Sequence, residues 1–283
     1  MKWQRSLLVV LFASATFIAC SDNGTDDPTP STQAANTTTA TIAPSTETLK
    51  SDAKEKRSDA AAQRLKGAIQ MMSEAVYPGD NTIQLIFKNV FKYDKNGNRL
   101  ELLNYKSDGG LVSTIRSAYD SAGKVVSEET VLANGAIDIK SQIKTDDKGN
   151  RVEQLDLKQG VAGNSLFNYK YIYKYDAAAH LIERLGYRGN GIFFLKYNFN
   201  YDANGNRTEW LQLSQTNGIM GKVVYKYDDK NNITEETNYK ADGSVKAAYT
   251  YTYDFDKKGN WVRQKKMQNG AVVEVRTREY KYY

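Results

Sequence analysis

Glutamates recur in this chain at positions that could recognise hydroxyl groups. Glu183, Glu209 and Glu235 lie 26 residues apart. Tyrosines recur around them; a tyrosine ring can stack on the face of a sugar, and a carboxylate can accept hydrogen bonds from its hydroxyls. A column of carboxylates among tyrosine rings could therefore bind a glycan. The candidate ligand face consists of Tyr171, Tyr197, Tyr225, Tyr251, Glu183, Glu209 and Glu235.

The same glutamates have a structural alternative. Tyrosine hydroxyls, Arg151 and Arg207 could satisfy the carboxylates in an ion-pair ladder, because buried polar groups usually find partners. The glycan hypothesis assumes that the turn before each glutamate contains a bulge, which places Arg99 and Glu101 on the face of Tyr93. Without that bulge the glutamates would turn to solvent.

Catalytic chemistry has little support in the sequence. His180 is the only histidine and Cys20 the only cysteine, so neither a His/Cys metal site nor a Ser-His-Asp or Cys-His system is expected. Carboxylate pairs could hydrolyse glycosidic bonds, but catalysis needs an asymmetric pair, and these glutamates recur in successive repeats. We expect no enzyme, no cofactor and no metal.

A repeated turn motif must position these residues. Tyr-Asp-x-x-Gly-Asn-Arg occurs at Tyr93–Arg99 and Tyr201–Arg207, and most copies follow one another after 26 residues. Its Asp can accept hydrogen bonds from backbone N–H groups, and its Gly supplies the positive φ of a bulged hairpin turn. Weaker copies begin at Tyr119, Thr145, Tyr175, Tyr227 and Phe255.

An Asp-Gly or Asn-Gly turn halfway through each repeat divides it into two strands. The repeats predict about 14 strands, and residues 67–93 form an opening hairpin that brings the number to about 16. This hairpin would turn at Pro78–Asn81, with Ile83, Leu85 and Phe87 on one face of its second strand. A helix over 59–76 is the alternative. An antiparallel meander of this size should curl into a single curved sheet, shell or barrel-like roll.

Period-two alternation separates two faces of the predicted sheet. Tyr169, Tyr171, Tyr173 and Tyr175 share one parity, and the other parity is mainly Lys, Asn and Thr. The tyrosine face should be packed and the lysine face solvated, as in antiparallel sheets with one water-facing side.

The N-terminus carries an export signal. Basic residues precede an apolar run, Leu7–Ile18, that is too short to span a membrane. Phe17–Cys20 resembles the lipobox of bacterial lipoproteins, which implies cleavage before Cys20 and attachment of acyl chains such as palmitate to it. An ordinary signal cut after Ala19 is the alternative. We expect residues 1–19 as the signal peptide, 20–49 as a disordered tether with lipidated Cys20, and 50–66 as a spacer or short helix.

The repeated motif resembles that of the YD-repeat (RHS-repeat-like) family, over about residues 93–283. The resemblance implies a YD-repeat β domain over 67–283 that builds a sheet of successive hairpins, and it implies carbohydrate binding for short lipoprotein members.

These observations predict a non-catalytic lipoprotein that is anchored to the outer membrane, on the cell surface or the periplasmic face, and binds a glycan or an envelope protein. Its partners would be the membrane, through the lipid anchor, and that ligand. The net charge is +6. We nevertheless expect no nucleic-acid binding, because the leader predicts export. Two alternatives remain: a structural scaffold of an envelope assembly without small ligand, and a transmembrane β-barrel. An exposed aromatic groove would favour binding, and a fully packed interior would favour the scaffold.

Overall fold

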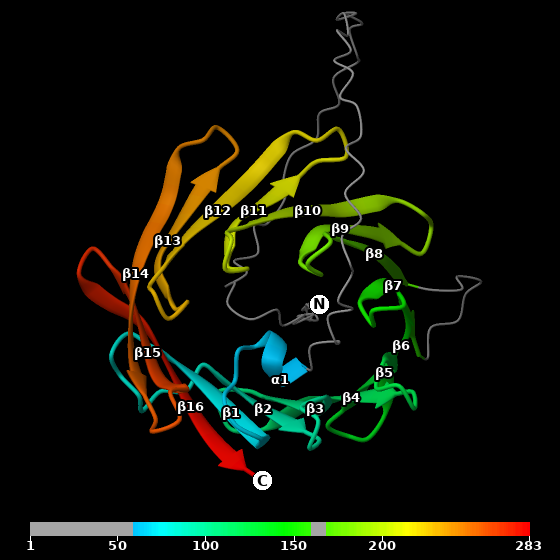
Figure 1. The fold of residues 1–283 in the computed structure, drawn as a ribbon, viewed down its shortest axis with the longest axis horizontal. Coiled ribbons are helices and arrows are strands. Elements are labelled where there is room, and N and C mark those ends of the chain that lie inside the picture. Colours follow the sequence, from blue (N-terminus) through cyan, green and yellow to red (C-terminus); the bar gives the residue numbers. More distant parts are fainter. Residues whose placement is uncertain (1–58, 160–167) are drawn as a thin grey trace, which may run out of the picture. The chain divides into compact units, whose positions relative to one another are not determined.

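Sixteen antiparallel strands form one closed barrel in the computed structural model, which describes residues 59–159 and 168–283 (Figure 1). The signal peptide, Cys20, the tether and most of the loop after Gln159 lie outside these residues. The elements are α1 (Asp59–Ala62), β1 (Ile69–Pro78), β2 (Phe87–Tyr93), β3 (Arg99–Tyr105), β4 (Leu111–Tyr119), β5 (Val125–Leu132), β6 (Ile137–Thr145), β7 (Arg151–Lys158), β8 (Tyr169–Tyr175), β9 (Leu181–Arg188), β10 (Phe193–Tyr201), β11 (Arg207–Leu213), β12 (Ile219–Tyr227), β13 (Ile233–Lys240), β14 (Val245–Phe255), β15 (Trp261–Gln268) and β16 (Ala271–Tyr282).

The first and last strands close the barrel. Each strand pairs with its neighbour in the sequence, and β1 pairs antiparallel with β16, with Met72 opposite Tyr280 and Glu74 opposite Arg278. Closure removes both sheet edges, which would otherwise expose unpaired backbone groups. The predicted all-β meander is confirmed, and among the described residues no helix is long and apolar enough to cross a membrane.

The opening hairpin differs from the prediction in its connection. Strand β1 ends at Pro78, and β2 begins only at Phe87. Ile83 and Leu85 were expected on the second strand but lie in the connection, where Ile83 is 92% exposed. Strand β1 runs where a helix was the alternative, and α1 is confined to Asp59–Ala62.

The repeated turns have the expected chemistry. In the β2–β3 turn, an Asp94 carboxylate oxygen accepts hydrogen bonds from the backbone N–H groups of Asn96 and Asn98, each at 2.8 Å. Gly97 has a φ of 81°, which a glycine adopts without steric penalty. Ala179 takes the glycine position of the β8–β9 turn with a φ of 63°.

In four copies of the motif the tyrosine that opens it joins neighbouring hairpins. Its hydroxyl donates to a backbone carbonyl at the turn of the preceding hairpin, as from Tyr201 to Leu181 at 2.9 Å and from Tyr227 to Arg207 at 2.7 Å. The same bond runs from Tyr119 and Tyr175, and on β14 from Tyr253, two residues before the Phe255 that opens that copy. Each bond gives a backbone carbonyl near the turn a partner, so this tyrosine recurs for a structural reason.

Residues 59–66, which we term the strap, bind the turns at one end of the barrel. Helix α1 lies within the ring of strands (Figure 1). The Asp59 carboxylate accepts from the backbone N–H of Arg99 and the hydroxyl of Tyr119, and Gln63 donates to the hydroxyl of Tyr93. The tyrosine face is therefore the inner face. Further along, the strap contacts Gly205, Asn206, Asn231 and Asn260.

Replacing Arg64 by alanine should loosen this end of the barrel. Its guanidinium donates to the Asn206 side chain and to the carbonyls of Gly205 and Asn231, and such charged hydrogen bonds contribute about 1.5–3 kcal/mol. We expect a loss of about 1–2 kcal/mol in unfolding free energy, with faster amide hydrogen exchange at the β10–β11 turn. Lys148→Ala, on an exposed turn, is the control; equal exchange in both variants would contradict the role of the strap.

Candidate ligand-binding site

The predicted glutamate column lies on the outer face of the barrel, so its expected place among the tyrosines is wrong. Glu183 pairs with Lys174 at 2.6 Å, and Glu235 with Lys226 at 2.8 Å. Glu209 accepts from Asn200 at 2.9 Å and lies 3.7 Å from Lys222. These lysine and asparagine partners belong to the solvated parity.

A second bulge after each turn explains the difference. Arg99 pairs opposite Tyr93, as expected, but the register then shifts so that Glu101 pairs with Lys92 and Leu102 with Phe91. The same shift follows Tyr201 and Tyr227. Because side chains alternate between faces, one extra residue moves every later side chain of the strand to the opposite face.

The inner face carries a continuous group of rings, which we term the aromatic wall. It consists of Tyr171, Tyr173, Tyr197, Phe199, Trp210, Tyr225 and Tyr251. The four predicted tyrosines, Tyr171, Tyr197, Tyr225 and Tyr251, therefore share this face. Their binding role stays a prediction.

The centre of the wall is accessible, whereas its flanks are buried. Tyr197 packs edge-on against Trp210 with 5.1 Å between ring centroids, and the Trp210 indole donates to the Tyr225 hydroxyl at 3.2 Å. Tyr171 and Tyr225 are each only 3% exposed, but Tyr197, Phe199 and Trp210 are half-buried. Strands β10 and β11 thus present rings that a ligand can contact.

Cations lie against these rings. The Arg184 guanidinium is 4.5 Å from the Tyr171 ring centroid, and Arg207 is 5.6 Å from Phe199 and 5.5 Å from Tyr225. A cation over an aromatic face is attracted by the ring quadrupole. The wall is therefore both aromatic and basic.

The hydroxyls of the wall keep their protons at neutral pH. Burial raises the pKa of Tyr171 to about 12. Burial also raises the pKa of Tyr225, although nearby Arg207 opposes the shift. For Tyr251, burial and the adjacent Glu236 carboxylate both raise the pKa. These hydroxyls act as hydrogen-bond donors.

The inner face of β3 to β7 carries buried carboxylates with polar partners. Glu128 binds Arg99 at 2.9 Å and Arg151 at 3.1 Å. The Asp156 carboxylate accepts from Ser141 and Gln154 at 2.7 Å each, and burial raises its pKa. Among the described residues these side chains bond to one another, although the buried Nε of Arg99 has no hydrogen-bond partner.

Gly186 allows the wall to pack at its β9 flank. A Cβ at this position would lie 2.9 Å from the Phe194 ring. That ring packs edge-on against Tyr171, with 6.0 Å between the ring centroids. Gly186→Ala should lower the unfolding free energy by about 1–3 kcal/mol, the usual effect of overpacking, as measured by chemical denaturation. In the control Gly221→Ala the nearest atom would be 3.7 Å away, so an equal loss in both variants would contradict the steric explanation.

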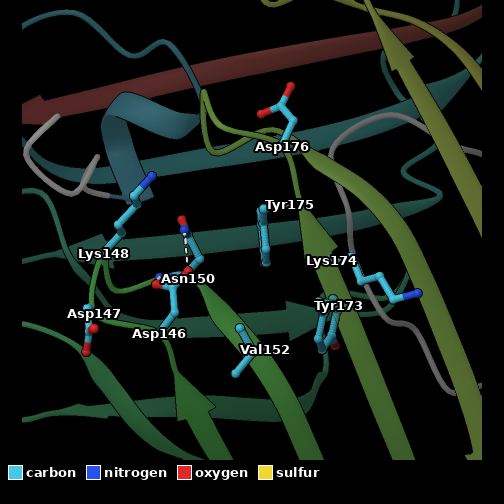
Figure 2. A pocket seen from close by; sticks show the side chains of 9 residues that line it. All are labelled: Asp146, Asp147, Lys148, Asn150, Val152, Tyr173, Lys174, Tyr175 and Asp176. Carbon is cyan, nitrogen blue, oxygen red and sulfur yellow. Dashed lines mark hydrogen bonds between the residues drawn. The ribbon is translucent and has the colours of Figure 1, made fainter. Parts of the chain in front are cut away.

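A cleft of about 550 Å³ between the β6–β7 and β8–β9 turns is a weaker candidate (Figure 2). The Asp146 side chain is engaged by Asn150, as drawn, and Asp176 by His180 at 2.9 Å. These carboxylates serve to hold their own turns. Across residues 59–159 and 168–283, no group of three or more His, Cys, Asp or Glu residues is placed to hold a metal ion.

Sequence reasoning missed Arg184, Trp210, Glu236 and Lys266 as inner residues. Each of these residues stands on the strand that follows a repeated turn, where the second bulge reverses the alternation. Buried Glu236, directly after the predicted Glu235, shows the displacement by one residue. The preceding strands β10, β12 and β14 have their bulge near their first residues. The tyrosines after it keep one alternation, which is why those positions were predicted correctly.

No protein-family model matches this chain, and no curated protein matches it either. Among solved structures, a porin-like protein from Bacteroides uniformis ATCC 8492 is similar with a TM-score of 0.54 and 11% identity, over 76% of this chain and 99% of that one. A porin-like protein from Bacteroides vulgatus ATCC 8482 has a TM-score of 0.41 at 10% identity, over 75% and 98% of the two chains.

The expected membership in the YD-repeat family is wrong. No model of any family matches the chain, and the similar structure with a TM-score of 0.54 is a porin-like protein. The Tc holotoxin pore of Photorhabdus luminescens reaches a TM-score of only 0.32 at 16% identity, over 66% of this chain and 9% of that one. The turn motif arises here from hairpin and bulge chemistry. The TM-score of 0.54 to the porin-like protein of Bacteroides uniformis shows a shared fold.

Proposed function

We propose that this protein is an exported, non-catalytic binding protein of the cell envelope that holds a glycan against the aromatic wall inside its barrel. The half-buried rings of Tyr197, Phe199 and Trp210 carry this proposal. Apolar ring faces beside protonated hydroxyls and arginines suit the mixed apolar and polar surface of a sugar.

An envelope location is supported by the leader and by the fold. The run before Cys20 predicts export and lipidation, and acyl chains on that residue would supply stable membrane attachment. The solved barrel with a TM-score of 0.54 is described as porin-like, which fits an envelope protein.

The outer face favours a barrel surrounded by water over one that spans the membrane. Lys174 and Lys226 point outward with 60% and 68% exposed side chains, each paired with a glutamate. A membrane-spanning barrel needs an outward apolar band, and a lysine or arginine at its midplane costs about 2–4 kcal/mol. Detergent-free solubility of the full chain with Cys20→Ala would support this interpretation, and aggregation outside detergent would oppose it.

A glycan array probed with the full-length chain in detergent tests the binding function. We expect saturable binding to a subset of glycans. A folded protein that binds none of them would overturn the proposal.

A scaffold is the second candidate, favoured by the buried parts of the interior. Tyr171 and Tyr225 are almost fully covered, and Glu128 joins Arg99 on β3 to Arg151 on β7. A deletion strain with a weakened envelope, together with an array that shows no bound glycan, would favour this function.

A further inference from the structure

Exposed aliphatic side chains gather at the end of the barrel opposite the strap. Arg64 of the strap binds the β10–β11 and β12–β13 turns, so in this meander the β9–β10, β11–β12 and β13–β14 turns lie at the other end. Ile192, Ile219, Met220 and Val245 lie in or directly after these turns and are 58%, 50%, 55% and 56% exposed. We term these four residues the apolar rim.

The apolar rim follows three consecutive hairpins. Ile192 lies in the β9–β10 turn, and the other three residues open β12 and β14. Strand β13 joins β12 to β14 at this point, since Lys240 pairs with Gly221 and Tyr239 with Val245. The rim therefore occupies one sector of the barrel end, and exposed apolar surface that is gathered in this way marks a contact site.

Apolar side chains at the strap end are less available. Leu100, Val126, Ile182 and Phe255 are only 38–42% exposed. Tyr283, which is 50% exposed, is held there by its hydroxyl, which donates to a backbone carbonyl. The two ends of the barrel therefore differ, and the rim is the more apolar surface toward solvent.

Basic side chains outnumber acidic ones around the rim. Arg188, Lys240 and Lys246 are exposed beside the β9–β10 and β13–β14 turns, against one carboxylate, that of Asp242. The Asp242 carboxylate accepts hydrogen bonds from the backbone N–H and the hydroxyl of Ser244. Apolar side chains flanked by cations suit a lipid surface, where the former enter the boundary of headgroups and acyl chains and the latter attract anionic headgroups.

The chain before the strap is long enough to let this end reach a membrane. Residues 21–58 separate Cys20, the predicted site of lipid attachment, from the strap, and a chain of this length can extend over more than about 100 Å. The longest strand, β16 with 12 residues, spans only about 40 Å. A lipid on Cys20 would also hold the barrel at a high effective concentration near the bilayer, so that a weak contact suffices.

We propose that the apolar rim docks on the surface of the bilayer, with its four side chains at the boundary of headgroups and acyl chains and with Arg188, Lys240 and Lys246 on anionic headgroups. The barrel then stands on the membrane by this end, and the strap end faces away. This inference rests on the proposed envelope location and goes beyond the glycan-binding function.

Dyes at the two ends of β9 test this orientation in the full-length protein. Ile192→Cys and Ile182→Cys would each carry a nitrobenzoxadiazole dye, with vesicles of phosphatidylethanolamine and phosphatidylglycerol added. We expect a blue shift, and quenching by spin-labelled lipids, for the dye at Ile192→Cys and neither for the dye at Ile182→Cys. Both variants would also be made with Cys20→Ala, so that the comparison does not depend on acylation.

A charge placed in the rim locates the contact. Met220→Glu in the Cys20→Ala protein should weaken vesicle binding about tenfold. Val126→Glu, the same change at the strap end, should leave the affinity unchanged. Replacing phosphatidylglycerol by phosphatidylcholine should weaken binding about fivefold for each basic residue that contacts the headgroups.

Three results would overturn the docking. These are a response of the dye at Ile182→Cys alone, a response of neither dye, and a response without vesicles that rises with protein concentration, which would assign the rim to a second copy of the chain. Absence of acyl chains on Cys20, measured by mass spectrometry, would refute only the proposed anchor, because the Cys20→Ala comparison still reports on the rim.

Discussion

Glu74→Ala is expected to lower the free energy of unfolding by about 3–5 kcal/mol, because it leaves buried Arg278 without its counter-charge and leaves Arg276 with Glu274 alone. The Glu74 carboxylate lies 2.8 Å from Arg278 and 3.5 Å from Arg276, and the three side chains are only 7%, 10% and 11% exposed. They join β1 to β16, where the barrel closes. Chemical denaturation of the full chain would measure the loss.

The control for this prediction is on the same pair of strands. Glu279→Ala removes a carboxylate of β16 that is exposed on the outer face and accepts a hydrogen bond from Ser73 at 3.4 Å. Its effect should stay below about 1 kcal/mol, as for most exposed polar contacts. Similar losses in the two variants would show that the buried ion pairs do not hold the closing strands.

Glu128→Gln is expected to destabilise the barrel at neutral pH by about 2–3 kcal/mol and to reduce its sensitivity to acid. Burial alone would raise the pKa of Glu128, but Arg151 and Arg99 outweigh it and hold the pKa below its usual 4.5. A carboxyl whose pKa is lowered on folding stabilises the folded state above its unfolded pKa. That contribution disappears as the pH falls from about 4.5 through the lower folded-state pKa.

The measurement is the unfolding free energy of both proteins between pH 7 and pH 3. The difference between wild type and Glu128→Gln should shrink as the pH falls. Glu129→Gln is the matched control, because Glu129 is the next residue, faces outward and has a 39% exposed side chain paired with Lys140. A constant difference across this range would contradict the assigned role of Glu128.

The sequence predicted the hairpins well, because their signals are local. The Asp and Gly of each turn act within a few residues, as Asp94 and Gly97 do in the β2–β3 turn. Period-two alternation then placed Tyr171, Tyr197, Tyr225 and Tyr251 on a common face. The strand count also followed, since each repeat contributes a hairpin.

The inner charges could not be predicted in the same way, because they depend on the second bulge. That bulge reverses the alternation after each turn, so Glu235 faces outward and Glu236 inward. The repeat also does not predict which side chain pairs with a buried carboxylate. Glu128 binds arginines, but Glu236, at the same position of its own repeat, binds Lys266 and Tyr251. Closure by β1 and β16 likewise depends on contacts between residues far apart in the sequence.

The most direct test of ligand binding at the inner wall compares tyrosines on the two faces. We would measure the dissociation constant of the tightest array glycan for wild type, Tyr197→Ala and Tyr187→Ala. Tyr197 packs against Trp210 on the inner face, whereas Tyr187, equally half-buried, pairs with Phe193 on the outer face. Binding inside the barrel predicts a loss of about tenfold or more for Tyr197→Ala, equal to at least about 1.4 kcal/mol, and none for Tyr187→Ala. Unchanged affinity in folded Tyr197→Ala, with a loss in Tyr187→Ala, would place the ligand on the outer face and contradict the proposal.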